Sequence, residues 1–323
     1  MTHDAAVDLP RQGIVLPRDL PAAELLDFAR LIEELGFDEV WVVEDLGFRG
    51  GIAQATAVLA VTTRVRVGIG ILPAAARNVA FEAMELATLA QLYPGRLDIG
   101  IGHGMPTWLS SVGSWPERPL SYLESHVGAL TALLRGERVS SAGPIELHDV
   151  QLEPSSIPEV VPDILLGVRG PRSLAASGRI AAGTILAEPS TPEYVRDALD
   201  QVASERPHRL VTYNAAVVAD SDAEALAAVR PGLEWIGEPD WAPHIAPLEF
   251  AAEFAALRER SATREEFAAA MPDEWVARLA LAGTPKTVRA RVAELGRAGV
   301  TSSAMIPIGP DPWAAVRSLA RAL

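Results

Sequence analysis

The chain has 323 residues, of which 49% are hydrophobic and none is cysteine, and its formal net charge is −14. This composition supports a large folded core and excludes disulfides and thiolate zinc sites. Without a cluster of Lys or Arg, a nucleic-acid-binding surface is not expected. The N-terminus lacks the basic and apolar segments of a signal peptide, and Arg64 and Arg66 interrupt the most apolar region. We therefore expect a cytoplasmic protein that does not enter the membrane.

Short apolar runs alternate with amphipathic stretches along the whole chain. The predicted strands are residues 13–17, 39–45, 65–72, 96–101, 163–168, 183–187, 209–218 and 302–308. Apolar residues at helical spacing predict a helix over 21–36 that Gly36 ends, and further helices over 79–92 and 120–135. Cap residues and prolines place other helix starts near Ser173, Pro192, Asp222 and Thr284.

The strands are nearly continuous apolar runs, which is typical of a parallel sheet covered by helices. Eight strand–helix units in a chain of this length predict an α/β fold, the (β/α)8 TIM barrel, as a single domain over 1–323 with a tail at 1–12. The alternative, an open doubly wound sheet, usually has a Gly-rich turn after its first strand, and "GIVLPRD" offers none.

Two segments are longer than ordinary connections in a barrel: residues 105–157 after the fourth strand and 231–271 after the seventh. Such excursions are usually lids or interfaces. The second contains Trp235, Trp241, His244 and Phe250 close together. These residues predict either a local hydrophobic core or a surface that covers substrate or contacts a second subunit.

Glycines interrupt the third and fourth strands near their carboxyl ends, where TIM barrels carry their active sites. "GIGHGMP" has glycine at 100, 102 and 104, and "VGIGILP" has it at 68 and 70. Bare main chain suits the close approach of an anion or a flat ring, and it also marks bulges. Tight packing against neighbouring strands is the alternative for both stretches.

The fifth strand ends in "GVRGPRSL", where Gly170-Pro171 makes a turn and Ser173 can cap the next helix. A helix N-terminus beside Arg169 and Arg172 is suited to bind an anion. An ordinary cap with surface arginines is the alternative. Together the turns after strands four and five suggest a phosphate site between them.

The candidate catalytic residues are Glu44, Asp45 and His103, each at the end of a predicted strand. Glu44 and Asp45 are adjacent, so only one of them can face the barrel mouth as a proton shuttle or hydrogen-bond acceptor, and the alternative is a cap on the next helix. His103 is a candidate contact for cofactor or substrate. No HxH, HExxH or G-x-S-x-G motif is present, so we expect neither a metal centre nor triad hydrolysis.

An ordered set of segments resembles the bacterial luciferase-like flavin oxidoreductase superfamily, and most of all its deazaflavin (coenzyme F420) branch. The segments are "GFDEVWVVED", "VRVGIGILPAAARN", "ELATLAQLYPGRLDIGIGHG", "ILLGVRGPRSLAASGRIAAGTIL", "TPEYV" and "AGTPKTVRARVAELGRAGV". The resemblance covers residues 13–308. It implies a TIM barrel that holds a flavin or deazaflavin at its carboxyl end, and a homodimer.

The resemblance also assigns residues. It implies a non-prolyl cis peptide at Gly70–Ile71 in a bulge of the third strand, behind the ring of the cofactor. The phosphate tail would be held by the two turns, at Gly102, His103, Gly104, Val168, Arg169, Gly170, Pro171, Arg172 and Ser173. Relatives in the branch often have Asp-His where this chain has Glu44-Asp45, and some have Glu at Met105. Glu44, Asp45 or His103 would then have to supply any proton.

The function implied is hydride transfer between coenzyme F420 and a small organic substrate. Two alternatives keep the fold: an FMN-dependent monooxygenase, and a flavin- or deazaflavin-binding protein without catalysis. A phosphate-binding barrel isomerase or lyase is a further alternative that requires no flavin.

Overall fold

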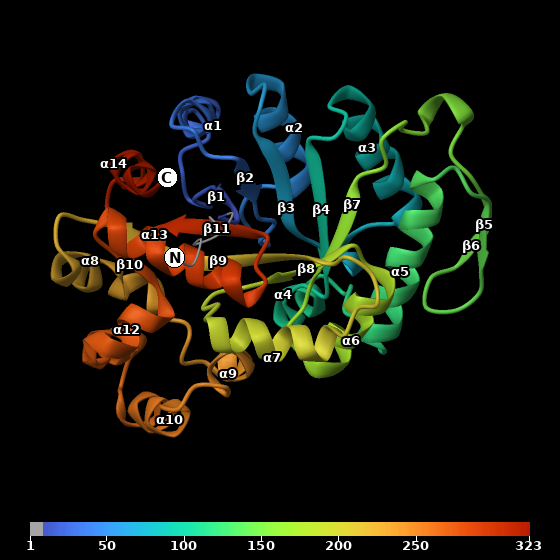
Figure 1. Cartoon of the computed structure of the whole chain (residues 1–323). Coiled ribbons are helices and arrows are strands. Elements are labelled where there is room, and N and C mark those ends of the chain that lie inside the picture. Colours follow the sequence, from blue (N-terminus) through green and yellow to red (C-terminus); the bar gives the residue numbers. More distant parts are fainter. Residues whose placement is uncertain (1–8) are drawn as a thin grey trace, which may run out of the picture.

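Eight parallel strands close into a barrel surrounded by helices in the computed structural model, which describes residues 9–323 (Figure 1). Around the barrel the order is β1-β2-β3-β4-β7-β8-β9-β11, and β11 returns to β1. These strands are β1 (Arg11–Val15), β2 (Glu39–Val42), β3 (Arg66–Pro73), β4 (Leu97–Gly102), β7 (Asp163–Gly167), β8 (Gly183–Leu186), β9 (Arg209–Val218) and β11 (Ser302–Pro307). Each corresponds to one of the predicted strands, so the TIM barrel is confirmed. Residues 1–8 of the expected tail lie outside the described residues, and Arg11 and Gln12 already belong to β1.

The sequence did not predict three short strands. β5 (Val139–Ser141) and β6 (Leu147–Val150) form an antiparallel hairpin in the first insertion, and β10 (Leu281–Gly283) pairs with the far end of β9. Runs of three or four residues are too short to show a periodicity.

Helices follow the strands, and most of them cover the barrel from outside. They are α1 (Leu25–Glu34), α2 (Gly51–Val61), α3 (Val79–Leu92), α4 (Pro106–Ser111), α5 (Pro119–Leu134), α6 (Pro171–Ile180), α7 (Pro192–Val202), α8 (Asp222–Val229), α9 (Ala242–Ile245), α10 (Ala251–Arg260), α11 (Arg264–Ala270), α12 (Asp273–Leu279), α13 (Pro285–Ala298) and α14 (Pro312–Leu319). Gly36, at φ +98°, follows α1 as predicted. One cap prediction was wrong: α6 begins after Gly170, and Ser173 lies inside its first turn.

The apolar side chains form two layers. Inside the barrel, Trp41 packs edge-on against Tyr213 at a centroid distance of 5.8 Å, together with smaller residues from the other strands. Outside the barrel, a larger layer joins the strands to the helices and includes Phe28 and Ile32 of α1. The barrel is therefore a packed core, and a ligand can enter only at its ends.

Charged residues close the amino end of the barrel. Asp98, at the start of β4, accepts hydrogen bonds from Arg209 at 2.7 and 2.9 Å and from Arg66 at 3.2 Å. Glu39, fully buried, accepts from the indole of Trp41 at 2.8 Å and from Ser302. These contacts hold the amino ends of the strands together, so a functional site is expected at the carboxyl end of the barrel.

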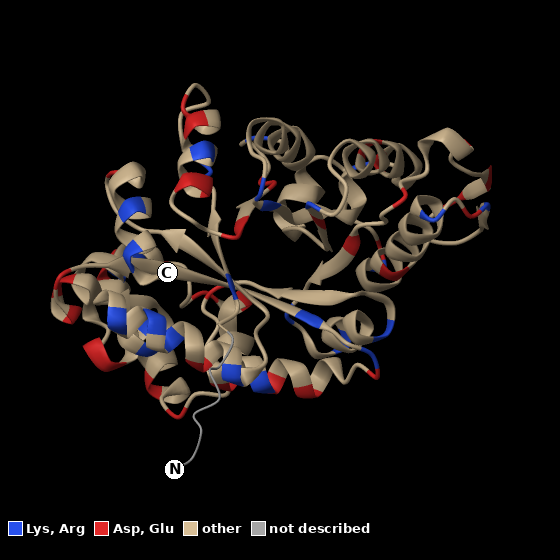
Figure 2. Cartoon of the chain, turned by 45° about the horizontal axis from the view of Figure 1, so that its top comes forward, with Lys and Arg blue, Asp and Glu red and all other residues tan. Residues whose placement is uncertain are grey.

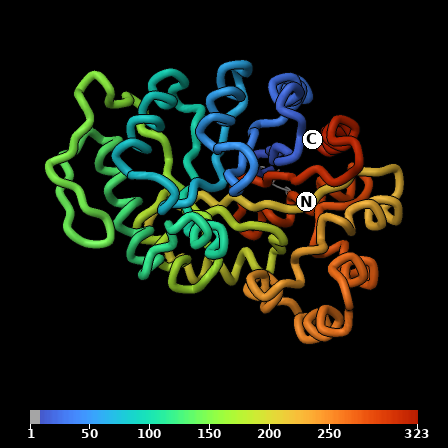
Figure 3. Tube along the Cα trace, turned by 180° about the vertical axis from the view of Figure 1, so that it is seen from behind, coloured from blue at the N-terminus to red at the C-terminus, as the bar shows by residue number. Residues whose placement is uncertain are grey.

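The two insertions project from opposite sides of the barrel (Figure 3, green and orange). The second has a core of its own, in which Phe254 meets Phe267 edge-on at 5.1 Å and Phe250 stacks on Trp275 at 4.9 Å. Of the four residues that suggested a local core, Phe250 is buried in this cluster and Trp241 packs against it. Trp235 lies outside that core, 49% exposed, with the guanidinium of Arg264 3.6 Å above its ring.

Acidic and basic residues are spread over the outer helices and loops (Figure 2). Within residues 9–323, no helix is both long and apolar enough to cross a membrane.

Candidate active site at the carboxyl end of the barrel

The third strand carries a bulge at the barrel mouth. Its register with β4 shifts between Ile69 and Leu72, and the Gly70–Ile71 peptide bond is cis, as the resemblance implied. The missing Cβ atoms on this strand make room for aromatic side chains. A Cβ at Gly68 would lie 2.3 Å from Trp41, and one at Gly70 would lie 2.0 Å from the hydroxyl of Tyr213. The packing alternative therefore explains both of these glycines.

The side chain of Ile71 fills the space beside the glycines of the neighbouring strands. A Cβ at Gly102 would come within 3.2 Å of Ile71 and 2.7 Å of the carbonyl oxygen of Gly167, and one at Gly167 within 2.4 Å of Ile71. A Cβ at Gly100 would meet the carbonyl oxygen of Ile69 at 2.3 Å. Packing thus explains why residues 100 and 102 are glycine. At Gly102, a ligand could contact only the backbone.

Gly104 turns the chain from β4 toward α4. Its φ is +70°, in the left-handed region that favours glycine, and a Cβ there would lie 2.8 Å from Pro73. This turn brings the loop after β4 against the end of β3, beside the bulge.

The start of α6 is open. Gly170 is its N-cap in an extended conformation, and apart from its two neighbours in the chain no residue of 9–323 has an atom within 4 Å of the position that a Cβ at Gly170 would take. No described side chain caps this end, and Pro171 occupies the first turn. A helix start of this kind has free amide groups and a positive end of the helix dipole, which suit an anion.

The two turns that the sequence predicted around a phosphate are in contact. Nε2 of His103, after β4, lies 3.2 Å from Oγ of Ser173 in the first turn of α6. Burial lowers the pKa of His103, which favours the neutral imidazole. His103 and Ser173 therefore form one wall of the opening at Gly170.

The other residues of the "GVRGPRSL" turn have different surroundings. Val168 is buried in the outer hydrophobic layer, so its side chain faces away from the mouth. Arg169 donates a hydrogen bond to the carbonyl oxygen of Asp240 at 2.9 Å and lies 5.1 Å over the ring of Trp241. Arg172 is exposed. The second insertion thus holds Arg169 in place, while Arg172 lies on the surface beside the helix start.

Glu44 and Asp45 both line a cleft of about 290 Å³ between the loop after β2 and α4, but each already has a partner. Glu44 accepts from the backbone amide of Gly51, at the start of α2, at 2.7 Å and from Arg77 at 2.7 and 2.8 Å. Asp45 accepts from Arg18 at 3.0 Å. Glu44 therefore caps the next helix, which was the alternative to a catalytic role.

Sequence reasoning missed two polar residues at the mouth. Glu188 follows the end of β8, and burial raises the pKa of its carboxyl group. Tyr213, on β9, is 6% exposed, and its hydroxyl has no hydrogen-bond partner within the described part of the chain. The signal for Glu188 was an acid directly after a predicted strand. Tyr213 lies in the middle of a strand and gave no signal.

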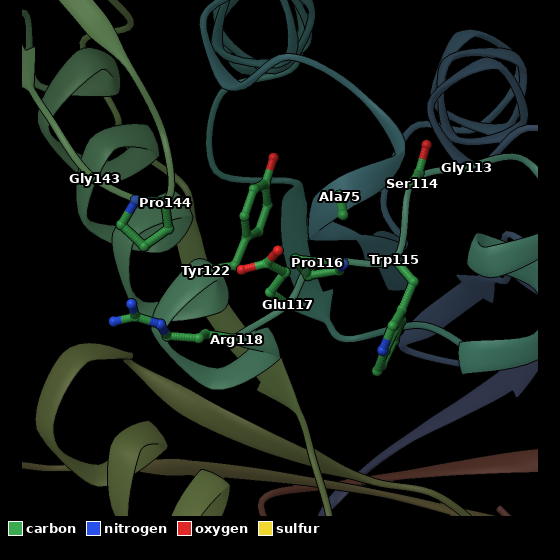
Figure 4. Close-up of a pocket in the computed structure, with 10 residues that line it drawn as sticks. All are labelled: Ala75, Gly113, Ser114, Trp115, Pro116, Glu117, Arg118, Tyr122, Gly143 and Pro144. Atoms are coloured by element: carbon green, nitrogen blue, oxygen red, sulfur yellow. The ribbon is translucent and has the colours of Figure 1, made fainter.

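A second cavity, of about 610 Å³, lies between the loop that precedes α5 and the β5–β6 hairpin (Figure 4). Trp115, Tyr122 and Pro144 line it, with Glu117 and Arg118 at the same loop. Ala75, in the turn directly after β3, also lines it. The expected phosphate residues line neither of these two cavities.

Comparisons with known proteins agree with this architecture. The family model described as luciferase-like monooxygenase matches residues 5–302. The 5,10-methylenetetrahydromethanopterin reductase of Methanolobus tindarius is 27% identical over 325 residues, covering 95% of this chain and 97% of the relative. The F420-dependent glucose-6-phosphate dehydrogenase of Microbacterium testaceum is 33% identical over 189 residues, covering 54% and 56%.

Among solved structures, the coenzyme F420-dependent tetrahydromethanopterin reductase from Methanopyrus kandleri superposes with a TM-score of 0.80 at 19% identity, covering 97% of both chains. Its fold is the fold of this chain. The barrel, the bulge in β3 and the nearly full-length match to the family model lead to one conclusion: this chain belongs to the luciferase-like monooxygenase family.

Proposed function

We propose that the protein is an oxidoreductase that transfers hydride between coenzyme F420 and a small organic substrate at the carboxyl end of the barrel. The main structural support is the open N-terminus of α6. The space beside Gly170 is empty, and the amides of the first turn have no side-chain cap. Relatives whose names include F420 dependence favour the deazaflavin over other phosphorylated coenzymes.

The residues at the mouth fit a phosphorylated tricyclic coenzyme. The amides of the first turn of α6, with Ser173 and His103, would hold the phosphate through hydrogen bonds. The main chain of Gly102 and Gly104 would lie beside the same phosphate, and the bulge at Gly70–Ile71 would support the ring. When bound, the deazaflavin supplies two-electron hydride chemistry, and the protein provides position and a defined electrostatic environment.

An FMN-dependent monooxygenase of the same fold is the second candidate. The name of the matching family favours it, and FMN also carries a phosphate that suits the start of α6. A protein that binds either coenzyme without turning it over would occupy the same site.

The test is a fluorescence titration of purified protein with F420 and with FMN, paired with the substitution Gly170→Asp. We expect F420 to bind more tightly than FMN. The Cβ of the new side chain has open space around it and its carboxylate can cap α6, so stability is kept or rises by a few tenths of a kcal/mol. Because it also repels the phosphate, affinity should fall by about tenfold or more, which is about 1.4 kcal/mol.

Gly128→Asp is the matched control. Gly128 lies on an exposed part of α5 with open space around it, so this variant adds the same charge away from the mouth. It should bind the coenzyme like the unaltered protein. Tighter FMN binding with NAD(P)H-coupled oxygen consumption would replace the proposal with the monooxygenase. Unchanged affinity in Gly170→Asp would reject the phosphate site.

We also propose that residues 1–323 act as a single domain, with 105–157 and 231–271 as insertions, in a cytoplasmic homodimer. Sedimentation equilibrium of the purified protein would test the dimer.

A further inference from the structure

The cleft between the loop after β2 and α4 has a mostly apolar lining. The side chains that give it this character come from both sides: Leu46, Phe48, Met105, Trp108, Leu109 and Val112. Leu46, Phe48 and Val112 are each at least half exposed. Single exposed apolar side chains are ordinary on a protein surface, but several around one cleft mark a place where a ligand or partner binds.

The three charged residues that line the cleft already have partners. Glu44 is held by Arg77, and Asp45 is held by Arg18. Arg49 donates hydrogen bonds to two backbone carbonyl oxygens of the loop after β1, at 2.6 and 3.0 Å. An ionised group of a ligand would find no unpaired charge among these residues, so the cleft favours an uncharged group.

The cleft adjoins the place proposed for the coenzyme ring. Pro73, which lines it, is the last residue of β3 and closely follows the bulge at Gly70–Ile71. Met105 directly follows Gly104, where a Cβ would lie 2.8 Å from Pro73. The turn after β4 and the end of the bulge strand thus meet at the cleft. A substrate that reaches the coenzyme can therefore place another of its groups there.

The volume of the cleft limits the size of this group. An apolar protein cavity of about 150 Å³ holds benzene. A cleft of about 290 Å³ therefore has room for about two fused rings or an alkyl group of similar volume. For an uncharged ligand, the removal of apolar surface from water is the main favourable contribution to binding.

We propose that this cleft binds the apolar part of the substrate, an uncharged aryl or alkyl group of up to about two rings in size. The inference rests on the proposed F420-dependent function and adds a class of substrate to it. Phe48 and Trp108 have flat faces against which such a group can pack. A sugar phosphate would leave the apolar lining exposed to water and would find no unpaired cation among the lining residues.

The experiment is a fluorescence titration of the purified protein with acedan, an uncharged naphthalene dye whose emission moves to shorter wavelength in apolar surroundings. We expect acedan to bind and glucose 6-phosphate not to displace it. Val112→Asp and Leu46→Asp place a carboxylate in the cleft and should each weaken dye binding by about tenfold or more. Val160→Asp is the matched control, because Val160 is a similarly exposed valine that does not line the cleft, and it should bind the dye like the unaltered protein.

The dye titration is repeated with F420 at saturation, and the dye should bind as well as before or more tightly. Absence of dye binding, or equal losses in Val112→Asp and Val160→Asp, overturns the inference. Displacement of the dye by F420 assigns the cleft to the coenzyme, and an altered sedimentation of Val112→Asp alone assigns it to a second copy of the chain; either result also overturns it. If the protein binds F420 but not the dye, the proposed function stands and the cleft inference fails. If it binds the dye but not F420, the apolar site stands and the proposed function fails.

Discussion

At Gly70 a single missing Cβ leaves room for the hydroxyl of Tyr213. The glycines of β3 and β4 were ambiguous in the sequence, because a close ligand and a close side chain both require bare main chain. The side chains of Trp41, Tyr213 and Ile71 occupy the space beside Gly68, Gly70 and Gly102. In contrast to these three, Gly170 has open space beside it, so the ligand argument is strongest at that residue.

Gly70→Ala should lower the free energy of unfolding by about 1–3 kcal/mol, the usual range for overpacking a core. The new Cβ would lie 2.0 Å from the hydroxyl oxygen of Tyr213 and 3.0 Å from its ring carbon. Urea denaturation measures the effect. Tyr213→Phe removes the closest atom, so the double variant Gly70→Ala/Tyr213→Phe should recover much of the lost stability. If the double variant loses the sum of the two single losses, this packing is contradicted.

At the scale of elements, one carboxylate connects three parts of the mouth. Glu44 follows β2, accepts from the first amide of α2, and pairs with Arg77 in the loop between β3 and α3. The sequence presented Glu44 and Asp45 as equal candidates for catalysis. The position of Arg77, thirty-three residues further along the chain, gives Glu44 its structural role.

Glu44→Ala should therefore lower the free energy of unfolding by about 1–2 kcal/mol, because a partly buried charged hydrogen bond and a helix-terminal contact are both lost. Glu85→Ala, on the exposed side of α3, removes the same number of atoms and charge and should change stability by less than about 0.5 kcal/mol. If Glu44→Ala and Glu85→Ala lower the free energy of unfolding equally, Glu44 has no special structural role.

At the scale of the whole molecule, Asp98 joins strands from both halves of the barrel. Arg66 comes from β3 and Arg209 from β9, 111 residues after Asp98. Burial by itself would raise the pKa of Asp98, but hydrogen bonds from Arg209 and Arg66 more than offset it, and the pKa is lowered. A lowered pKa in the folded state means that the ionised carboxylate stabilises the fold.

Asp98→Asn should destabilise the protein by about 2–3 kcal/mol at pH 7, less than for a fully buried pair, because both arginines are partly exposed. The stabilisation is present above the unfolded pKa of about 4 and is lost as pH falls below it, through the folded pKa. Urea denaturation at several pH values should thus give curves for the two proteins that converge in acid.

Asp163→Asn is the matched control for that prediction. Asp163 bonds the same Arg209 at 3.0 Å but is 48% exposed, so its loss should cost about 0–1 kcal/mol. A gap between Asp98→Asn and the unaltered protein that stays constant down to acid pH would contradict the assignment to Asp98.

The sequence by itself determined the eight barrel strands, most of the helix starts and the end of the barrel that carries the site. Those features follow from local apolar runs, prolines and caps, which act over a few residues. Only the tertiary structure decided which glycines face a side chain and which face open space. It also decided that Glu44 is bound by Arg77, and that the hydroxyl of Tyr213 lies against Gly70. Such contacts depend on chain closure around the barrel, which brings together residues that are far apart in sequence and have no common local pattern.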